Sequence, residues 1–176
     1  MTDFSSLGLA EPILRAVSAE GYTSPTPIQA KVIPAMMQGT DVLGIAQTGT
    51  GKTAAFVLPI LNTLQQHMRP AQPKACRTLI LSPTRELAAQ IADNIRVYGK
   101  HTRPSVAVVV GGARIPAQIK ALANGNDIVV ATPGRLLDLV KNKAARLDAV
   151  ETVVLDEADQ MFDLGFMPQI KKIMAQ

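Results

Sequence analysis

Several residue types are scarce in this sequence of 176 residues, and each scarcity excludes a class of protein. The single cysteine, Cys76, cannot form an internal disulfide and is typical of a reducing compartment. Two histidines and one cysteine cannot build a standard zinc site. The longest apolar run, residues 54–61, is far too short to cross a membrane, and the N-terminus shows no signal peptide. We therefore expect a cytoplasmic protein without a membrane segment.

Charged residues are also few, at 18% of the chain against 47% apolar residues. This composition excludes a disordered tail and a coiled coil, and the length suits one globular domain. The net charge of +4 comes from a mildly basic middle, whereas residues 151–176 are acidic. The distribution fits a polyanion-binding surface next to a cation site, but it fits a solvated mixed surface equally well.

Five short β-branched runs recur along the chain, and each is nearly continuous in apolar residues rather than alternating. They cover residues 41–45, 77–81, 106–110, 127–131 and 151–155. Continuous apolar runs indicate strands that are buried on both faces, as in a parallel sheet. Helical apolar spacing separates them in residues 52–68, 86–97 and 135–140. Together these patterns predict a doubly wound α/β fold.

The first forty residues contain no predicted strand. Residues 11–20 and 28–37 show helical patterns, and the segment between them is rich in turn residues, with prolines at 25 and 27. We expect residues 1–40 to form an N-terminal extension on a core of residues 41–176.

A glycine-rich loop joins the first apolar run to the helix predicted after it. The loop comprises Ala46, Gln47, Thr48, Gly49, Thr50, Gly51, Lys52 and Thr53. Its glycines allow successive backbone N–H groups to face phosphate oxygens at a helix N-terminus. Lys52 would contact the β- and γ-phosphates, and Thr53 would offer a hydroxyl to Mg²⁺. The common phosphate-loop pattern has glycine where this chain has Ala46. The alternative interpretation is a glycine-rich turn between a strand and a helix that binds nothing.

The last apolar run ends in an acidic segment. Asp156 stands where a second Mg²⁺ contact is expected, and Glu157 could orient or deprotonate a water that attacks the γ-phosphate. Asp159 could hydrogen-bond neighbouring loops. The alternative is that these carboxylates only stabilise the first turn of a helix.

With these motifs identified, the sequence resembles the DEAD-box RNA helicases of superfamily two, of bacterial type. The matching segments are Gly21–Gln29 with Phe4 upstream, residues 46–53, Pro83–Ala88, Gly111–Gly112, Thr132–Arg135 and Asp156–Asp159. They occur in the family's order over nearly the whole chain, and Ala46 is the usual family residue. The resemblance implies a RecA-like, doubly wound parallel sheet of the P-loop NTPase class with a helical Q-motif extension.

The resemblance also implies an adenine pocket in the N-terminal extension. Gln29 would read the adenine edge, because its amide can both donate and accept a hydrogen bond. Phe4 would stack on the ring, and Gly21, Tyr22 and Thr23 would line the pocket. Without the resemblance, Phe4 could simply cover the core and Gln29 could be a solvated helix residue.

The resemblance further implies contact with the sugar-phosphate backbone of single-stranded RNA. The implied residues are Thr84, Arg85, Gly111, Gly112, Arg114, Thr132, Gly134 and Arg135. Each follows the C-terminal end of a predicted strand, and such loops gather at one edge of a parallel sheet. Aromatic residues are only 3% of the chain, so readout by base stacking is not expected. Arg114 could instead be a surface cation, and Arg135 could pair with Asp138.

The implied activity is that of an ATP-dependent RNA helicase. No Ser-Ala-Thr motif III and no second RecA-like domain are found before Gln176, so we expect a monomeric fragment that binds adenine nucleotide but barely hydrolyses ATP. A nucleotide-gated RNA-binding scaffold without productive hydrolysis is the alternative. A guanine-nucleotide switch is disfavoured because Asn142-Lys143-Ala144-Ala145 lacks the aspartate of its base-reading motif. A DNA helicase is distinguished from an RNA helicase only by the full motif set.

Overall fold

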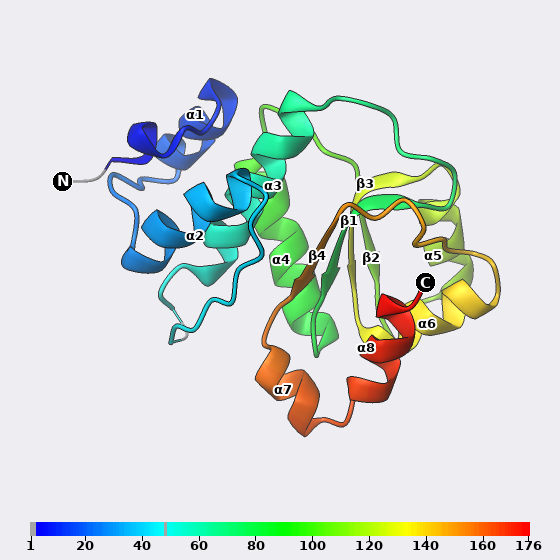
Figure 1. Ribbon diagram of the computed structural model, residues 1–176. Helices are drawn as coiled ribbons and strands as arrows, with labels where there is room; N and C mark the ends of the chain where they lie inside the picture. The colour runs from blue at the N-terminus through cyan, green and yellow to red at the C-terminus, as the bar shows by residue number, and fades with distance from the viewer. Residues whose placement is uncertain (1–2, 48) are drawn as a thin grey trace. The chain divides into compact units, whose positions relative to one another are not determined.

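The computed structural model describes residues 3–47 and 49–176 and divides into two compact units. Unit 1 comprises Met1–Met68 and Asp93–Pro104, and unit 2 comprises Arg69–Ala92 and Ser105–Gln176. The ribbon in Figure 1 follows the chain through both units. The prediction that residues 1–40 form an extension on a core of residues 41–176 stays a prediction. In the structure, the extension and the phosphate loop belong to the same compact unit.

Unit 1 is built mainly from helices. They are η1 (Phe4–Leu7), α1 (Glu11–Ala19), α2 (Pro27–Met37) and α3 (Lys52–Gln66). Helices α2 and α3 pack against each other, and Ile13, Ile33, Leu58 and Leu61 are almost completely buried. The helices predicted for this part of the chain are therefore confirmed, with ends that differ by one or two residues.

Helix α2 begins at a capping box that its sequence encodes. The Thr26 hydroxyl accepts a hydrogen bond from the Gln29 N–H, and the Gln29 side-chain oxygen accepts one from the Thr26 N–H. Pro27 occupies the first turn, where its missing N–H costs no hydrogen bond. This start places Gln29 on the inner side of the helix, with only 5% of its surface exposed.

The strand predicted for residues 41–45 is wrong for this structure. The segment has no regular secondary structure, and its apolar side chains Leu43 and Ile45 are 87% and 85% exposed. A strand forms only where its N–H and C=O groups pair with a neighbouring strand, and no strand in the described part of the chain pairs with this segment. Apolar, β-branched sequence reports a tendency to be buried in a sheet but not the presence of a partner.

Unit 2 contains a four-stranded parallel sheet in the order β2-β3-β1-β4. The strands are β1 (Cys76–Leu81), β2 (Val106–Val109), β3 (Asn126–Ala131) and β4 (Thr152–Leu155). The predictions for these four strands are confirmed. The register pairs Leu81 with both Ala131 and Leu155, and Val109 with Ala131, so all four strands end at nearly the same level (Figure 1).

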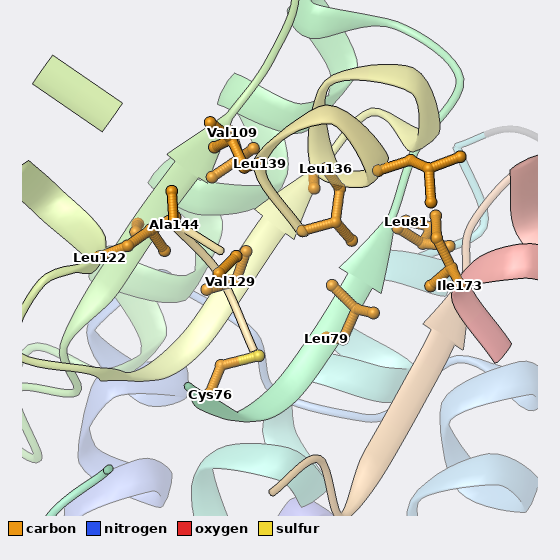
Figure 2. Packing of buried hydrophobic residues seen from close by; sticks show 14 of the residues in the cluster. Cys76, Leu79, Leu81, Val109, Leu122, Val129, Leu136, Leu139, Ala144 and Ile173 are labelled. Carbon is orange, nitrogen blue, oxygen red and sulfur yellow. The ribbon is translucent and has the colours of Figure 1, made fainter. Parts of the chain in front are cut away.

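The helices of unit 2 cover the sheet and connect its strands. They are the first part of α4 (Arg85–Tyr98), then α5 (Ile115–Leu122), α6 (Pro133–Lys141), α7 (Ala158–Asp163) and α8 (Met167–Met174). Figure 2 shows alternate strand residues such as Leu79 and Val129 packing with Leu136 and Leu139 of α6. Ile80, of the opposite parity, is fully buried as well. Both faces of the central strands are therefore covered, which explains their uninterrupted apolar sequence.

This topology determines where the functional loops of unit 2 lie. Because all four strands are parallel and end in register, the loops that follow them emerge at one edge of the sheet. Among the residues described, no helix combines the length and apolar character needed to cross a bilayer.

Candidate nucleotide and nucleic-acid sites

The loop after β1 is fixed at both of its ends. The Ser82 N–H donates to the Ala131 carbonyl at 2.9 Å, which extends the pairing of β1 with β3 by one residue. Two residues later, the Thr84 hydroxyl accepts a hydrogen bond from the Leu87 N–H at 3.2 Å and so caps α4. This cap leaves the Thr84 hydroxyl proton available for a phosphate oxygen. It also orients the neighbouring Arg85 at the start of the helix.

The double glycine after β2 lies against this arginine. Gly112 has a φ of +76°, and a Cβ at this position would lie 2.7 Å from Nη1 of Arg85. A residue with a side chain would be strained here by its backbone and would also displace the arginine. The sequence analysis selected Arg85 and Gly112 from separate motifs, and the structure brings them together.

The loop after β3 contacts the same segment from α6. Nη1 of the half-buried Arg135 donates to the carbonyl oxygen of Ala113 at 3.0 Å. The hydrogen bond holds Arg135 against the neighbouring loop, and the predicted contact of this arginine with RNA stays a prediction. Thr132 begins the loop, and its N–H donates to the Val109 carbonyl at 3.0 Å. The loops after β1, β2 and β3 therefore form one connected surface.

The remaining members of the predicted RNA-binding set lie around this surface. Arg114 is exposed at the N-cap of α5, and a Cβ built on Gly111 or Gly134 meets no atom within 4 Å. Gly111 is exposed and Gly134 is half-buried, and both leave open space where other residues have a side chain. The Arg85 guanidinium also bonds Glu86 at 2.9 Å, and this hydrogen bond lowers the pKa of the Glu86 carboxyl. Its positive charge is therefore partly offset at this surface.

The acidic segment after β4 begins at the same edge of the sheet. The Asp156 N–H donates to the Leu81 carbonyl at 2.9 Å, and only 8% of the aspartate is exposed. Glu157 follows with φ +51° and ψ +50°, a left-handed conformation that is costly for a residue with a side chain. Strained backbone of this kind concentrates at functional sites. Asp159 is exposed, and its carboxylate accepts from the Gln160 N–H at 2.9 Å.

The helix-start alternative holds for Asp159, which lies in the first turn of α7, but Glu157 differs. Glu157 occupies the N-cap position of α7 without making a side-chain capping bond. The carboxylate of a residue recruited only to begin a helix would be expected to make that bond.

The phosphate loop of unit 1 leads directly into α3. Gly49 and Gly51 have φ values of +80° and +84°, and the Thr50 hydroxyl donates to the Gln47 carbonyl at 2.7 Å. Gly51 is the N-cap of α3, so Lys52 and Thr53 are its first two residues. This arrangement combines a curled backbone with the positive end of a helix dipole, and it suits a phosphate group. Thr48 lies outside the described residues. Ala46, the first residue of the loop, is half-buried.

Gln29 connects the Q-motif segment to this loop. Its amide nitrogen donates to the Gly51 carbonyl at 3.2 Å, while its amide oxygen accepts from Thr26. The amide keeps one hydrogen and one lone pair beyond these bonds, which is the pattern needed to read an adenine edge. The alternative of a solvated helix residue is wrong, because the side chain is buried.

The other predicted pocket residues differ in their accessibility. The Phe4 ring is 4% exposed and packs inside unit 1, as the core alternative expects, so stacking on a base would require the ring to turn outward. Tyr22 is 46% exposed, and its hydroxyl lies 3.3 Å from that of Tyr98. Burial raises the pKa of Tyr98, and the hydrogen bond with Tyr22 adds to the effect. Gly21 and Thr23, which flank Tyr22, are exposed.

The sequence analysis missed two contributors to these sites. Thr26 completes the capping box of Gln29, and the pattern Thr-Pro-x-Gln carried that signal. Gln118 donates to the backbone of the double-glycine loop at 3.0 Å, and no sequence pattern signalled it, because its helix was not predicted. No group of three or more His, Cys, Asp or Glu side chains that could hold a metal ion occurs in the described part of the chain.

Comparison with known proteins identifies relatives of the whole chain. The family model described as DEAD/DEAH box helicase matches residues 26–176. The chain is 48% identical over 176 residues to ATP-dependent RNA helicase DeaD of Klebsiella pneumoniae, covering 99% of this chain and 27% of that protein. It is 47% identical over 170 residues to DEAD-box ATP-dependent RNA helicase RhpA of Helicobacter pylori, covering 97% of this chain and 33% of that protein.

Solved structures that resemble this chain also carry DEAD-box or helicase names. A DEAD box protein from Methanococcus jannaschii matches with a TM-score of 0.90 and 38% identity, covering 99% of this chain and 47% of that one. A hypothetical ATP-dependent RNA helicase from Sulfolobus tokodaii matches with a TM-score of 0.86 and 43% identity, covering 96% and 47%. The chain spans about a third or less of the length of the Klebsiella and Helicobacter helicases. From its helicase motifs, its α/β fold and these matches, the chain belongs to the DEAD/DEAH box helicase family.

Proposed function

We propose that this chain is the ATP-binding, RNA-contacting lobe of an ATP-dependent RNA helicase. The observation that carries the proposal is the connected surface of unit 2, where Arg85 lies against Gly112 and Arg135 bonds Ala113. Three loops that are far apart in sequence meet there, and they bring together two guanidinium groups and exposed backbone amides.

This surface suits the sugar-phosphate backbone of RNA. Guanidinium groups, threonine hydroxyls and glycine N–H groups all donate hydrogen bonds to phosphate oxygens, and such contacts carry little sequence information. The proposed ligand is therefore single-stranded RNA, or one strand of a short duplex. Its backbone would be held by residues of the segments Pro83–Ala88 and Thr132–Arg135 and by the double glycine.

Unit 1 is proposed to bind the nucleotide. The N–H groups of residues 46–53 and the Lys52 ammonium would hold the phosphates of ATP, and Gln29 would select adenine with its remaining hydrogen and lone pair. Thr53 and Asp156 are the proposed Mg²⁺ contacts. Since Thr53 belongs to unit 1 and Asp156 to unit 2, this pairing rests on the motifs rather than on a distance. Bound Mg²⁺ would neutralise charge that develops on the phosphates.

Glu157 is proposed as the group that orients or deprotonates the attacking water. Its left-handed backbone supports this role, because the chain holds a strained residue where a helix start would not require one. In the complete protein, a second RecA-like domain would close on the first with ATP and RNA bound, and hydrolysis would release them. By itself, the 176-residue chain is expected to bind adenine nucleotide with little turnover.

The second candidate is a nucleotide-gated RNA-binding scaffold that does not hydrolyse ATP. The same surface and the same phosphate loop would serve it. Glu157 separates the two proposals. Hydrolysis needs a group that orients or deprotonates water, and a scaffold that does not hydrolyse ATP does not need one.

The test is ATP turnover by the complete protein with single-stranded RNA, with single-stranded DNA of the same sequence, and without nucleic acid. We expect RNA to stimulate turnover and Arg135→Ala to raise the RNA concentration needed for half-maximal stimulation. Turnover that ignores RNA, or that DNA stimulates equally, would contradict an RNA helicase. If ATP strengthens RNA binding but is not hydrolysed, the scaffold is supported.

A further inference from the structure

Gln118 is a buried polar residue in a helix that is otherwise largely exposed. Of the eight residues of α5, only Gln118 and Leu122 are buried, and Gln118 is 5% exposed. Its amide nitrogen donates to the carbonyl oxygen of Val110 at 3.0 Å. Val110 is the last residue before the double glycine, so Gln118 bonds the point at which the chain leaves β2.

The other end of the same amide has no partner. Among the residues that the structure describes, Oε1 of Gln118 is buried and accepts no hydrogen bond. A buried, unpaired acceptor destabilises a fold. A methionine of equal length would remove the unpaired amide oxygen, but it would leave the Val110 carbonyl without this donor. A position chosen for packing alone would therefore favour an apolar residue. The hydrogen bond that Gln118 donates to the Val110 carbonyl is the feature that explains a glutamine here.

The segment that Gln118 bonds is contacted by two further side chains. Arg85 lies against Gly112, and Arg135 donates to Ala113, each from a different helix. Arg85 is exposed and Arg135 is half-buried, whereas Gln118 is buried. Gly111 and Gly112 have no side chain to anchor them, so contacts such as these three can restrain the turn.

We propose that Gln118 is a positioning residue that holds the Gly111–Gly112 turn in the conformation that presents its backbone N–H groups to an RNA phosphate. The inference rests on the proposed function, in which this turn contacts RNA. Gln118 touches neither RNA nor nucleotide. Its loss raises the conformational entropy of the free turn, which RNA binding must then reduce.

The first test replaces Gln118 by methionine in the complete protein. Gln118→Met keeps the length and volume of the side chain and removes both the donor and the unpaired acceptor. We expect the RNA concentration for half-maximal ATPase stimulation to rise about tenfold, the usual scale for one net hydrogen bond. We expect kcat at saturating RNA, ADP affinity and the thermal unfolding midpoint to stay close to the wild type. Unchanged RNA dependence would overturn the proposal. Ile119→Met, on an exposed position of the same helix, is the matched control.

The second test uses protonation to restore the donor. The Gln118→Glu side chain can donate to Val110 only as a neutral acid, and burial raises the pKa of a carboxyl group. Relative to the wild type at each pH, this variant should bind RNA almost normally near pH 5.5 and weakly near pH 8. Gln118→Met should show no such dependence. If the RNA affinity of Gln118→Glu relative to the wild type is the same at both pH values, the proposal is overturned, even if Gln118→Met fails to fold.

A third variant separates the inference from the function on which it rests. If the wild type does not bind RNA, or Arg135→Ala binds it normally, the proposed RNA surface is wrong. If the wild type binds RNA, Arg135→Ala weakens binding and Gln118→Met does not, the surface stands and only the role of Gln118 is refuted.

Discussion

The two units assemble their sites in different ways. In unit 2, parallel strands in register bring together loops that lie 22 to 27 residues apart in the sequence, such as Arg135 with Ala113 and Arg85 with Gly112. In unit 1, the phosphate loop depends on a local feature, two left-handed glycines at a helix start, and on one longer contact from Gln29. Sheet register thus controls the proposed nucleic-acid surface, whereas backbone conformation controls the proposed phosphate site.

The five apolar runs of the sequence also differ between the two units. Four of them form strands in unit 2, while residues 41–45 in unit 1 remain exposed without a strand partner in the described chain. Similar sequences therefore give different structures, because a strand needs a neighbour to pair with.

The largest expected effect comes from the acidic segment of unit 2. Glu157→Gln in the complete protein should lower RNA-stimulated ATP turnover by about 10²- to 10⁴-fold, the usual contribution of a general base. ATP and RNA binding should persist, because the amide keeps the shape of the carboxylate. Steady-state kinetics and equilibrium binding measure the two effects. Asp163→Asn, an exposed change at the end of α7, should leave turnover unaffected. Retained turnover in Glu157→Gln would remove this residue from its role.

The next effect concerns the phosphate loop of unit 1. Lys52→Ala should weaken ATP and ADP binding by about 10- to 100-fold, as expected for the loss of hydrogen bonds to a charged group. AMP, which lacks the distal phosphates, should bind almost normally. Calorimetry with the three nucleotides measures the difference, with Lys31→Ala on the exposed side of α2 as the control. An equal loss for all three nucleotides would indicate a general distortion of unit 1.

Two glycines of the same loop allow a matched comparison of stability. Gly49→Ala should cost about 1–2 kcal/mol, because an L-residue is strained at a φ of +80°. Gly51→Ala has the same strain at +84°, and its Cβ would also overlap the amide nitrogen of Gln29, so it should cost about 1–3 kcal/mol more. Denaturant unfolding measures both values. Equal losses in the two variants would mean that the Gln29 contact does not constrain the loop.

The smallest effect lies at the edge of unit 2 opposite to the functional loops. Hydrogen bonding from the nearly buried Arg77, and to a lesser extent from Arg69, lowers the pKa of Glu151. The folded state therefore binds this proton less tightly than the unfolded chain, so the stabilisation is present above the unfolded pKa of about 4.3. It is lost as the pH falls through the lower folded value.

Glu151→Gln should accordingly reduce the free energy of unfolding by about 1 kcal/mol at pH 7 and by less near pH 3. Denaturant unfolding at the two pH values measures this change. Glu11→Gln, at an exposed pair with Arg15 in unit 1, should change stability little at either pH. A Glu151→Gln deficit of the same size at both pH values would show that the charge of Glu151 is not responsible.

Most secondary structure was predictable because it follows from local patterns. Continuous apolar runs found β1 to β4, and three-to-four-residue spacing found α1 to α4 and α6. Helix α5 was not predicted, although Ile115, Ile119 and Leu122 have helical spacing, and in the structure both isoleucines are exposed while Gln118 is buried. Periodicity alone assigns the wrong face to such a helix.

Site residues were predictable where a motif dictates backbone conformation. Gly49, Gly51 and Gly112 all have the positive φ that only glycine adopts without strain, and Gln29 lies in a capping box that its own sequence encodes. The burial of Phe4 was not predictable from the motif, because a single aromatic residue can stack on a ligand or fill a core equally well.

The sequence by itself determined the family, the order of the motifs and the glycine conformations, because these depend on residue type and on short-range geometry. Only the tertiary structure decided that Arg85 meets Gly112, that Arg135 bonds Ala113 and that Gln118 supports Val110. Such contacts depend on which strands are neighbours and in what register they pair, and each strand's sequence is compatible with more than one neighbour.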